Sequence, residues 1–114
     1  MASYQELLLA RRAEILAAIG VSSEELTGIR FARSDGTADD EHDPEGSTLS
    51  SDWSRITSLQ AAAVASLDEV DRALERIDDG TFGTCVVCGS AIPDARLRVR
   101  PWADRCVPCA AATA

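Results

Sequence analysis

The chain has 114 residues, of which 26% are charged and five are aromatic, and its formal net charge is −8. This length fits one domain, or one small domain with an extension, and the scarcity of aromatic residues argues against a large globular core. No apolar run approaches the roughly 20 residues of a membrane span, and no apolar signal peptide precedes the chain, so we expect a soluble, cytoplasmic protein with no membrane partner.

The charge is unevenly distributed along the chain. Residues 1–79 hold seventeen acids and seven arginines, which gives −10, whereas residues 80–114 hold two acids and four arginines, which gives +2. The acidic part argues against binding to the phosphate backbone of nucleic acids, which requires clustered cations. It favours a basic partner surface or a bound metal ion.

The first predicted element is a helix over residues 3–33. Its seam repeats at alternating intervals of four and three residues, which is typical of a coiled coil. The seam positions, five of them apolar, are Leu8, Arg12, Ile15, Ile19, Ser22, Leu26 and Ile29. We expect Leu9, Ala13 and Leu16 to widen the early part of this apolar stripe.

One position weakens the middle of this helix. Gly20 is less favourable there than alanine by about 1 kcal/mol. Ser22 and Glu25 also form a potential capping box, which would start a second helix. Because the register continues through the glycine, we predict one bent helix, with two helices and a break near residues 20–22 as the alternative.

An acidic loop is predicted near residues 34–47, where glycine, proline and acids cluster. Its acids are Asp35, Asp39, Asp40, Glu41, Asp43 and Glu45. The single histidine, His42, is expected to be a solvated loop residue, with metal ligation as the weaker alternative. Acidic loops often only keep a chain soluble, so the charge alone assigns no function.

A second helix is predicted over residues 50–79. Its seam, six of seven positions apolar, consists of Ile56, Gln60, Ala63, Leu67, Val70, Leu74 and Ile77. A seam this narrow requires one partner helix, so residues 1–79 are predicted to form an antiparallel helical hairpin (coiled coil). Gly80 follows the last apolar position and is expected to cap the helix. The predicted fold class is mainly α.

The four cysteines of the chain form two pairs in the last third of the sequence. Their pattern, C-x2-C-x17-C-x2-C, has the spacing of a four-thiolate zinc site and consists of Cys85, Cys88, Cys106 and Cys109. Two intervening residues let both thiolates of a pair converge on one ion, about 2.3 Å from each sulfur. Four sulfurs fill the tetrahedron, so we predict one structural Zn²⁺ in a small finger over residues 80–114.

Three other chemistries compete with zinc at these cysteines. Disulfides need an oxidising compartment, a redox C-x-x-C needs a βαβ context, and iron also accepts four thiolates. The spacing favours zinc over all three. Four thiolates on a divalent ion carry a net charge of 2−, which the nearby arginines would offset: Arg96, Arg98, Arg100 and Arg105.

Residues 80–109 also carry a more specific set of motifs. G-x-[FY]-G-x-C-x-x-C-G begins at Gly80 and is followed by I-P-x-A-R-L, R-P and C-x-x-C. In these motifs the chain resembles the DksA/TraR C4-type zinc-finger family. Residues 3–79 resemble the family only in plan, as a helical hairpin ahead of the finger.

The resemblance implies a partner and a mode of action. Family members bind RNA polymerase directly, without contacting DNA, and the hairpin enters the secondary channel, where acidic tip residues approach the catalytic magnesium. The family tip carries D-x-x-D-x-A. In this chain Asp40 and Asp43 supply D-x-x-D, and Glu45 occupies the position of the alanine. Asp40 and Asp43, helped by Glu41 and Glu45, would therefore act at the tip.

The resemblance also makes Arg96, Arg98 and Arg100 candidates for contact with the polymerase surface. Their alternative role is to neutralise the thiolate site or to pair with the acidic hairpin. We expect a monomeric transcription regulator and not an enzyme, because no nucleophile–base set is visible and the metal site is closed.

Two other functions stay open. A zinc-stabilised adaptor would use the hairpin seam to pair with a helix of another protein. Nucleic-acid binding by the finger would show a DNA affinity that falls steeply with salt.

Overall fold

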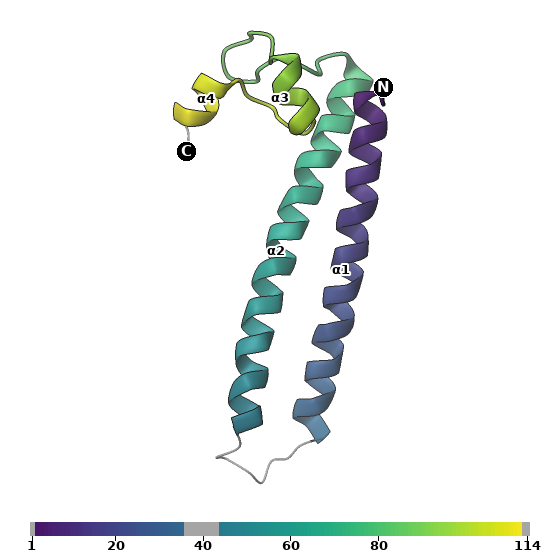
Figure 1. The fold of residues 1–114 in the computed structure, drawn as a ribbon, viewed down its shortest axis with the longest axis vertical. Coiled ribbons are helices and arrows are strands. Elements are labelled where there is room, and N and C mark those ends of the chain that lie inside the picture. Colours follow the sequence, from purple (N-terminus) through teal and green to yellow (C-terminus); the bar gives the residue numbers. More distant parts are fainter. Residues whose placement is uncertain (1, 36–43, 113–114) are drawn as a thin grey trace. The chain divides into compact units, whose positions relative to one another are not determined.

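The computed structural model describes the backbone of residues 2–35 and 44–112, and the side chains of residues 2–32 and 50–112. This part of the chain is mainly helical (Figure 1). Its helices are α1 (Tyr4–Asp35), α2 (Pro44–Asp79), α3 (Asp94–Val99) and α4 (Val107–Ala112). Within these residues the only β pairing is an isolated bridge between Thr84 and Ala91. The predicted fold class is confirmed.

The predictions about the acidic loop fall largely outside the described residues. The structure does not describe Asp40, Glu41, His42 or Asp43, and it does not describe the side chain of Glu45.

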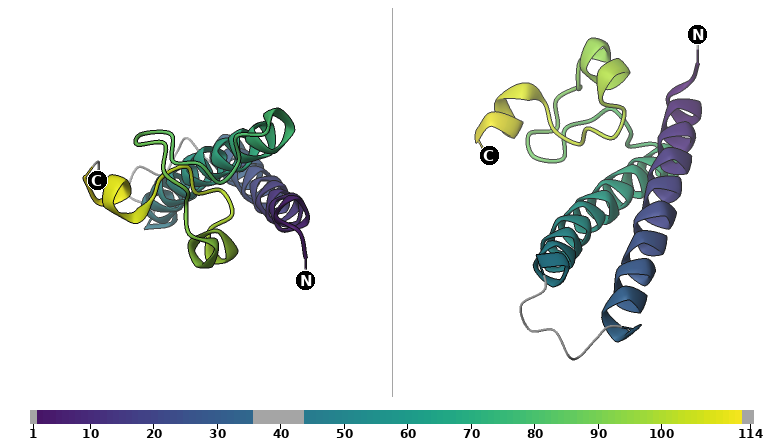
Figure 2. Two further views of the ribbon diagram at one scale, coloured as in Figure 1. Left: turned by 90° about the horizontal axis from the view of Figure 1, so that it is seen from above. Right: turned by 60° about the horizontal axis from the view of Figure 1, so that its bottom comes forward.

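The chain divides into two compact units. The finger unit consists of Met1–Glu14 and Ser66–Ala114, and the hairpin unit consists of Ile15–Ala65. Within each unit, α1 and α2 run antiparallel (Figures 1 and 2). Arg12 pairs with Asp71 in the finger unit, and Ser23 pairs with Gln60 in the hairpin unit. None of the described helices combines the length and the apolar character needed to cross a membrane.

The predicted seams form the contact between the two long helices. All fourteen seam positions are buried or half-buried, and the deepest are Leu8 at 0% and Val70 at 1% exposure. The polar seam residues are satisfied by partners: the Arg12 Nε donates to Asp71 at 2.7 Å, and the Gln60 amide donates to the Ser23 hydroxyl at 2.8 Å. The hairpin prediction and its register are confirmed.

The predicted widening of the α1 stripe is wrong. Leu9 is 50% and Leu16 is 42% exposed, and Ala13 is also exposed. All three lie one position past a seam residue, and a rotation of about 100° per residue carries them off the contact line. A two-helix contact covers only a narrow strip on each helix.

Helix α1 is continuous through residues 20–22, so the alternative of two separate helices is wrong. The Ser22 hydroxyl donates to the Ile19 carbonyl at 3.0 Å, inside the helix, and does not cap a new one. The capping box lies at the true start of α1 instead. The Glu6 amide donates to the Ser3 hydroxyl at 3.1 Å, and the Ser3 amide donates to the Glu6 carboxylate at 3.3 Å.

Helix α2 begins earlier than predicted. It starts at Pro44, so residues 44–47 belong to the helix and not to the loop. Proline is favoured at a first helical position because its fixed φ suits the helix and its missing N–H would have no helical partner there. Its helix-starting role was therefore visible in the sequence, but the acids around it favoured a loop.

Gly80 ends α2, as predicted. Its φ of +82° is the left-handed conformation that favours glycine. The Gly80 amide donates to the Ile77 carbonyl at 3.4 Å, and the Thr81 amide donates to the Arg76 carbonyl at 2.9 Å. These two bonds are the pattern of a Schellman motif, which turns the chain out of the helix and into the finger.

Replacing Gly80 with alanine is expected to lower the free energy of unfolding by about 1 kcal/mol, because an L residue is strained at positive φ. Gly28→Ala, inside α1, is the matched control. A Cβ atom at either position meets nothing within 4 Å, so only the backbone conformation differs. The control is expected to stabilise by about 0.5–1 kcal/mol. Urea unfolding measures the free energy of unfolding of both variants. If both substitutions stabilised the protein, or both destabilised it, the assignment of Gly80 as the cap would be contradicted.

Candidate metal centre

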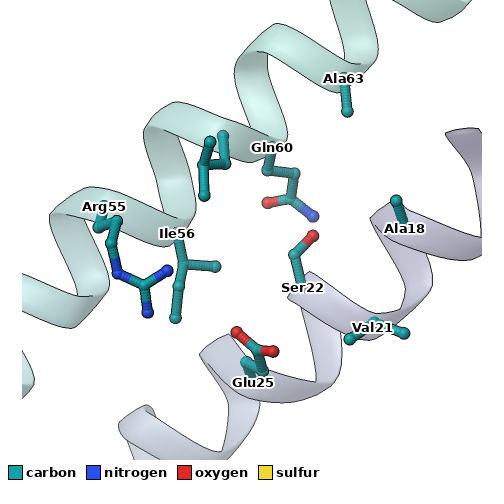
Figure 3. Close-up of a pocket in the computed structure, with 9 residues that line it drawn as sticks. Ala18, Val21, Ser22, Glu25, Arg55, Ile56, Gln60 and Ala63 are labelled. Atoms are coloured by element: carbon teal, nitrogen blue, oxygen red, sulfur yellow. The ribbon is translucent and has the colours of Figure 1, made fainter.

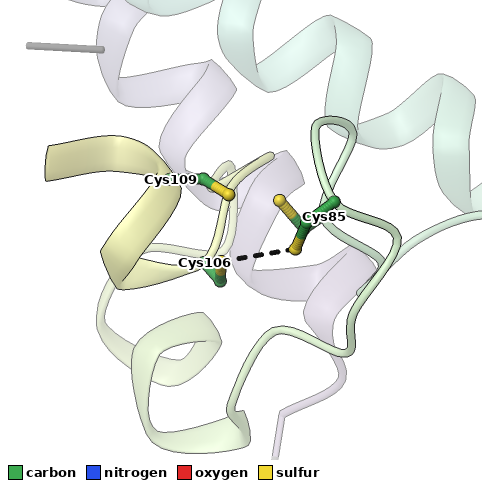
Figure 4. Close-up of side chains that lie close together, drawn as sticks. Cys85, Cys106 and Cys109 are labelled. Carbon is green, nitrogen blue, oxygen red and sulfur yellow. Dashed lines mark hydrogen bonds between the residues drawn. The ribbon is translucent and has the colours of Figure 1, made fainter. Parts of the chain in front are cut away.

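The four cysteine sulfurs converge on one point in the finger unit. All four lie within 4.8 Å of one another, and the sulfurs of Cys88 and Cys106 are 3.7 Å apart. Figure 4 shows the side chain of Cys85 opposite those of Cys106 and Cys109. A tetrahedron with about 2.3 Å from metal to sulfur has edges of about 3.8 Å. The cluster therefore fits one structural Zn²⁺, as predicted.

A tight loop positions the first cysteine pair. The Cys85 amide donates to the Ser90 carbonyl at 2.8 Å, and the Gly89 amide donates back to the Cys85 carbonyl at 3.0 Å. Gly89 has φ +77°, which a residue with a Cβ adopts at a cost. The loop thus folds Cys88 back toward Cys85.

The second pair is joined to the first by the backbone. The Val86 amide donates to the Asp104 carbonyl at 2.9 Å, which brings the segment before Cys106 against the first loop. The Ala110 amide donates to the Cys106 carbonyl at 2.9 Å, so Cys109 lies in the first turn of α4.

A small core supports the site from one side. Cys85 is 2% exposed and packs in a cluster with Ile92, Leu97 and Ala103. Cys88, by contrast, is exposed. One ligand pair thus joins a buried sulfur to one at the surface, so the metal fastens the outer loop to the core.

The surroundings of the cysteines give their thiols different pKa values. The amides of Cys88 and Cys106 donate hydrogen bonds that lower the pKa of Cys85 to about 6. The Ser90 side chain and amide lower the pKa of Cys88. The neighbouring Cys106 side chain, followed by burial, raises the pKa of Cys109 to about 12. Of these two thiols, Cys85 therefore ionises at a much lower pH than Cys109.

Zinc binding is expected to release protons and to weaken as the pH falls. At about pH 7.5 the Cys85 thiol, with a pKa of about 6, is already ionised, whereas Cys109, with a pKa of about 12, must lose its proton to bind. Below about pH 6, Cys85 also takes up a proton, which then competes with the metal. Calorimetric titration with zinc in buffers of different ionisation enthalpy counts the released protons. An affinity that stays constant from about pH 5 to about pH 8 would contradict this.

The arginines predicted near the site have mixed surroundings. The Arg96 Nε donates to the Arg105 carbonyl at 3.0 Å, and Arg98 forms an ion pair of 3.5 Å with Asp94. Arg96, Arg100 and Arg105 also line a cavity of about 380 Å³ beside Trp102.

Sequence reasoning assigned no packing role to Tyr4 or to Phe82, which pack against the finger core. Phe82 lies inside the cysteine motif, where an aromatic residue two positions after Gly80 was the available signal. Tyr4 lies at the other end of the chain and has no such local signal.

A helical hairpin joined to a closed four-cysteine site defines a small zinc-finger protein. Residues 80–113 match the family described as prokaryotic dksA/traR C4-type zinc finger. The structure of the transcription factor DksA2 from Pseudomonas aeruginosa matches with a TM-score of 0.80 and 25% identity, over 96% of this chain and 79% of that one. Residues 80–113 are thus a zinc finger of the DksA/TraR C4 type, and the fold of the chain matches that of DksA2.

Three curated relatives align over shorter stretches. An uncharacterized protein of Aquifex aeolicus is 44% identical over 55 residues, or 48% of this chain and 38% of the relative. General stress protein 16O of Bacillus subtilis is 36% identical over 64 residues, or 56% and 39%. The RNA polymerase-binding transcription factor DksA of Escherichia coli is 37% identical over 43 residues, or 38% and 28%. The matches thus span well under half of these relatives.

Proposed function

We propose that this protein is a non-enzymatic, cytoplasmic transcription regulator that acts as a monomer on RNA polymerase. The observation that carries the proposal is the likeness to DksA2, which covers 96% of the chain and thus extends beyond the finger. A relative that is 37% identical over 43 residues is named as an RNA polymerase-binding transcription factor. A closed thiolate site leaves no coordination position for substrate, which supports a regulator over an enzyme.

In this proposal the hairpin enters the secondary channel of the polymerase and brings its acids near the catalytic centre. Asp40 and Asp43 act there, helped by Glu41 and Glu45. Carboxylates suit a position close to a bound divalent cation, because the charges attract strongly where water is excluded.

The finger supplies the second contact in this proposal. Zinc held by the four cysteines fixes residues 80–114, whose net charge of +2 contrasts with the acidic remainder of the chain. Arg96, Arg98 and Arg100 face the polymerase surface. This contact involves protein, so no sequence-specific binding to DNA is expected.

The test combines binding and transcription with purified RNA polymerase. Asp40→Asn with Asp43→Asn is expected to retain binding but to lose most of the effect on initiation at sensitive promoters. The matched control is Glu24→Gln with Glu75→Gln, which removes the same charge from exposed helical positions. A response that survives the tip substitutions would show that these aspartates are not the acting residues. No binding by the parent protein would overturn the polymerase assignment.

A second function, a helical adaptor for another protein, is favoured by apolar side chains exposed in the hairpin unit. Val21 is 56% and Leu59 is 59% exposed, and both line a groove of about 370 Å³ between α1 and α2 (Figure 3). If the protein is zinc-loaded but does not bind polymerase, the adaptor becomes the leading function. Val21→Ser with Leu59→Ser would then be expected to abolish binding to the adaptor's partner.

A further inference from the structure

The first turn of α1 packs against the zinc finger, although the two segments stand at opposite ends of the sequence. The finger core is the cluster of Cys85, Ile92, Leu97 and Ala103, and Tyr4 is one of the partly buried residues packed on it. Both segments belong to the finger unit. The cluster is small, so one additional ring is a large fraction of its apolar surroundings.

Tyr4 is held by aromatic and cationic neighbours from the finger. Its ring centroid lies 5.2 Å from that of Phe82, with the ring planes tilted by 43°. The Arg98 guanidinium carbon lies 4.9 Å from the centre of the Tyr4 ring, and Arg98 also donates to the Ala2 carbonyl at 3.3 Å. Aromatic and cation–π contacts of this kind add to the gain from burial.

The ring of Tyr4, and not its hydroxyl, makes these contacts. The hydroxyl oxygen is buried and has no hydrogen-bond partner among the described residues. Because a buried hydroxyl without a partner is unfavourable, phenylalanine should serve at this position at least as well as tyrosine.

The contact leads directly to the metal ligands. Phe82 precedes Cys85 by three residues, and Cys85 is itself a member of the core on which Tyr4 packs. We propose that Tyr4 is a positioning residue for the zinc site, and that the first turn of α1 is a structural part of the finger. The residues that match the family begin at 80, so Tyr4 lies outside them.

Competition for zinc with a coloured chelator tests this on the full chain. Tyr4→Ala is expected to lower zinc affinity about tenfold, because it removes one aromatic contact and its burial. Tyr4→Phe should stay within about twofold of the parent protein, or bind more tightly. Leu9→Ala, on the same helix but 50% exposed, is the control and should leave the affinity unchanged. Circular dichroism shows in each case whether the long helices remain.

Two results would overturn the proposal. One is that Tyr4→Ala holds zinc as tightly as the parent, whether or not its helices melt earlier. The other is that Tyr4→Phe loses as much affinity as Tyr4→Ala, which would assign the effect to the hydroxyl.

A reciprocal measurement uses the fact that Tyr4 is the only tyrosine in the chain. Incorporated 3-fluorotyrosine therefore gives one fluorine resonance. If the first turn of α1 belongs to the finger, removal of zinc should shift this resonance toward its position in the unfolded chain. An unchanged resonance would show that Tyr4 is independent of the metal. Neither experiment involves polymerase, so failure here is distinct from failure of the proposed function.

Discussion

Replacing Cys88 with serine is expected to abolish stable zinc binding and to unfold residues 80–114, while most of the helical content survives. Structural zinc contributes about 10–16 kcal/mol in small fingers, which is as large as the whole stability of a typical domain, about 5–15 kcal/mol. Helices α1 and α2 contain 32 and 36 residues, whereas α3 and α4 contain six each. The circular dichroism signal should therefore fall modestly, and limited proteolysis should cut the finger first.

Cys88 is the suitable ligand for this experiment because it is exposed, so serine there leaves no cavity in the core. Val87→Ser is the matched control, since Val87 is 57% exposed in the same loop and is not a ligand. The control should keep its zinc and its protease resistance. If Cys88→Ser also kept both, zinc would not be what holds the finger together.

The second large effect is expected on the free energy of unfolding, when a buried leucine of the seam between α1 and α2 is replaced. Leu8→Ala should lower the free energy of unfolding by about 2–5 kcal/mol, because it removes a fully buried side chain and leaves a cavity. Leu9→Ala should change it by about 0.5 kcal/mol or less. The two leucines are adjacent and chemically identical, but Leu8 is 0% and Leu9 is 50% exposed. Urea unfolding of the zinc-loaded protein measures both variants, and equal losses would mean that the helix register is wrong.

The parts of the fold that follow from periodicity were predictable from the sequence. Spacings of four and three identified both seams, including the polar positions Arg12 and Gln60, because a two-helix contact has one geometric repeat. The zinc site was also predictable from spacing in the sequence, because the two cysteines of each C-x-x-C pair must both reach one ion. Gly80 was predictable because few residues tolerate its backbone conformation.

Other features depend on contacts that local patterns do not contain. Ser3 with Glu6, and Ser22 with Glu25, have the same capping signature, and only tertiary packing decides that the second pair lies inside a helix. Packing also decides that Leu16 faces outward in spite of its apolar side chain. Tyr4 was not predictable because its partners, Phe82 and Arg98, are distant in sequence.

The contact between the Arg98 side chain and the Ala2 carbonyl joins residues 96 positions apart, and this has a consequence for biosynthesis. The first turn of α1 leaves the ribosome before its partners in the finger have been synthesised. Ile15–Ala65 is contiguous in sequence, so this unit can pair its helices while the chain is still growing. The finger unit must wait until the residues around Arg98 have been synthesised, because the long loop between its two segments has to close before their contacts form. We therefore expect each newly made molecule to capture its metal only after the helices of the hairpin unit have paired.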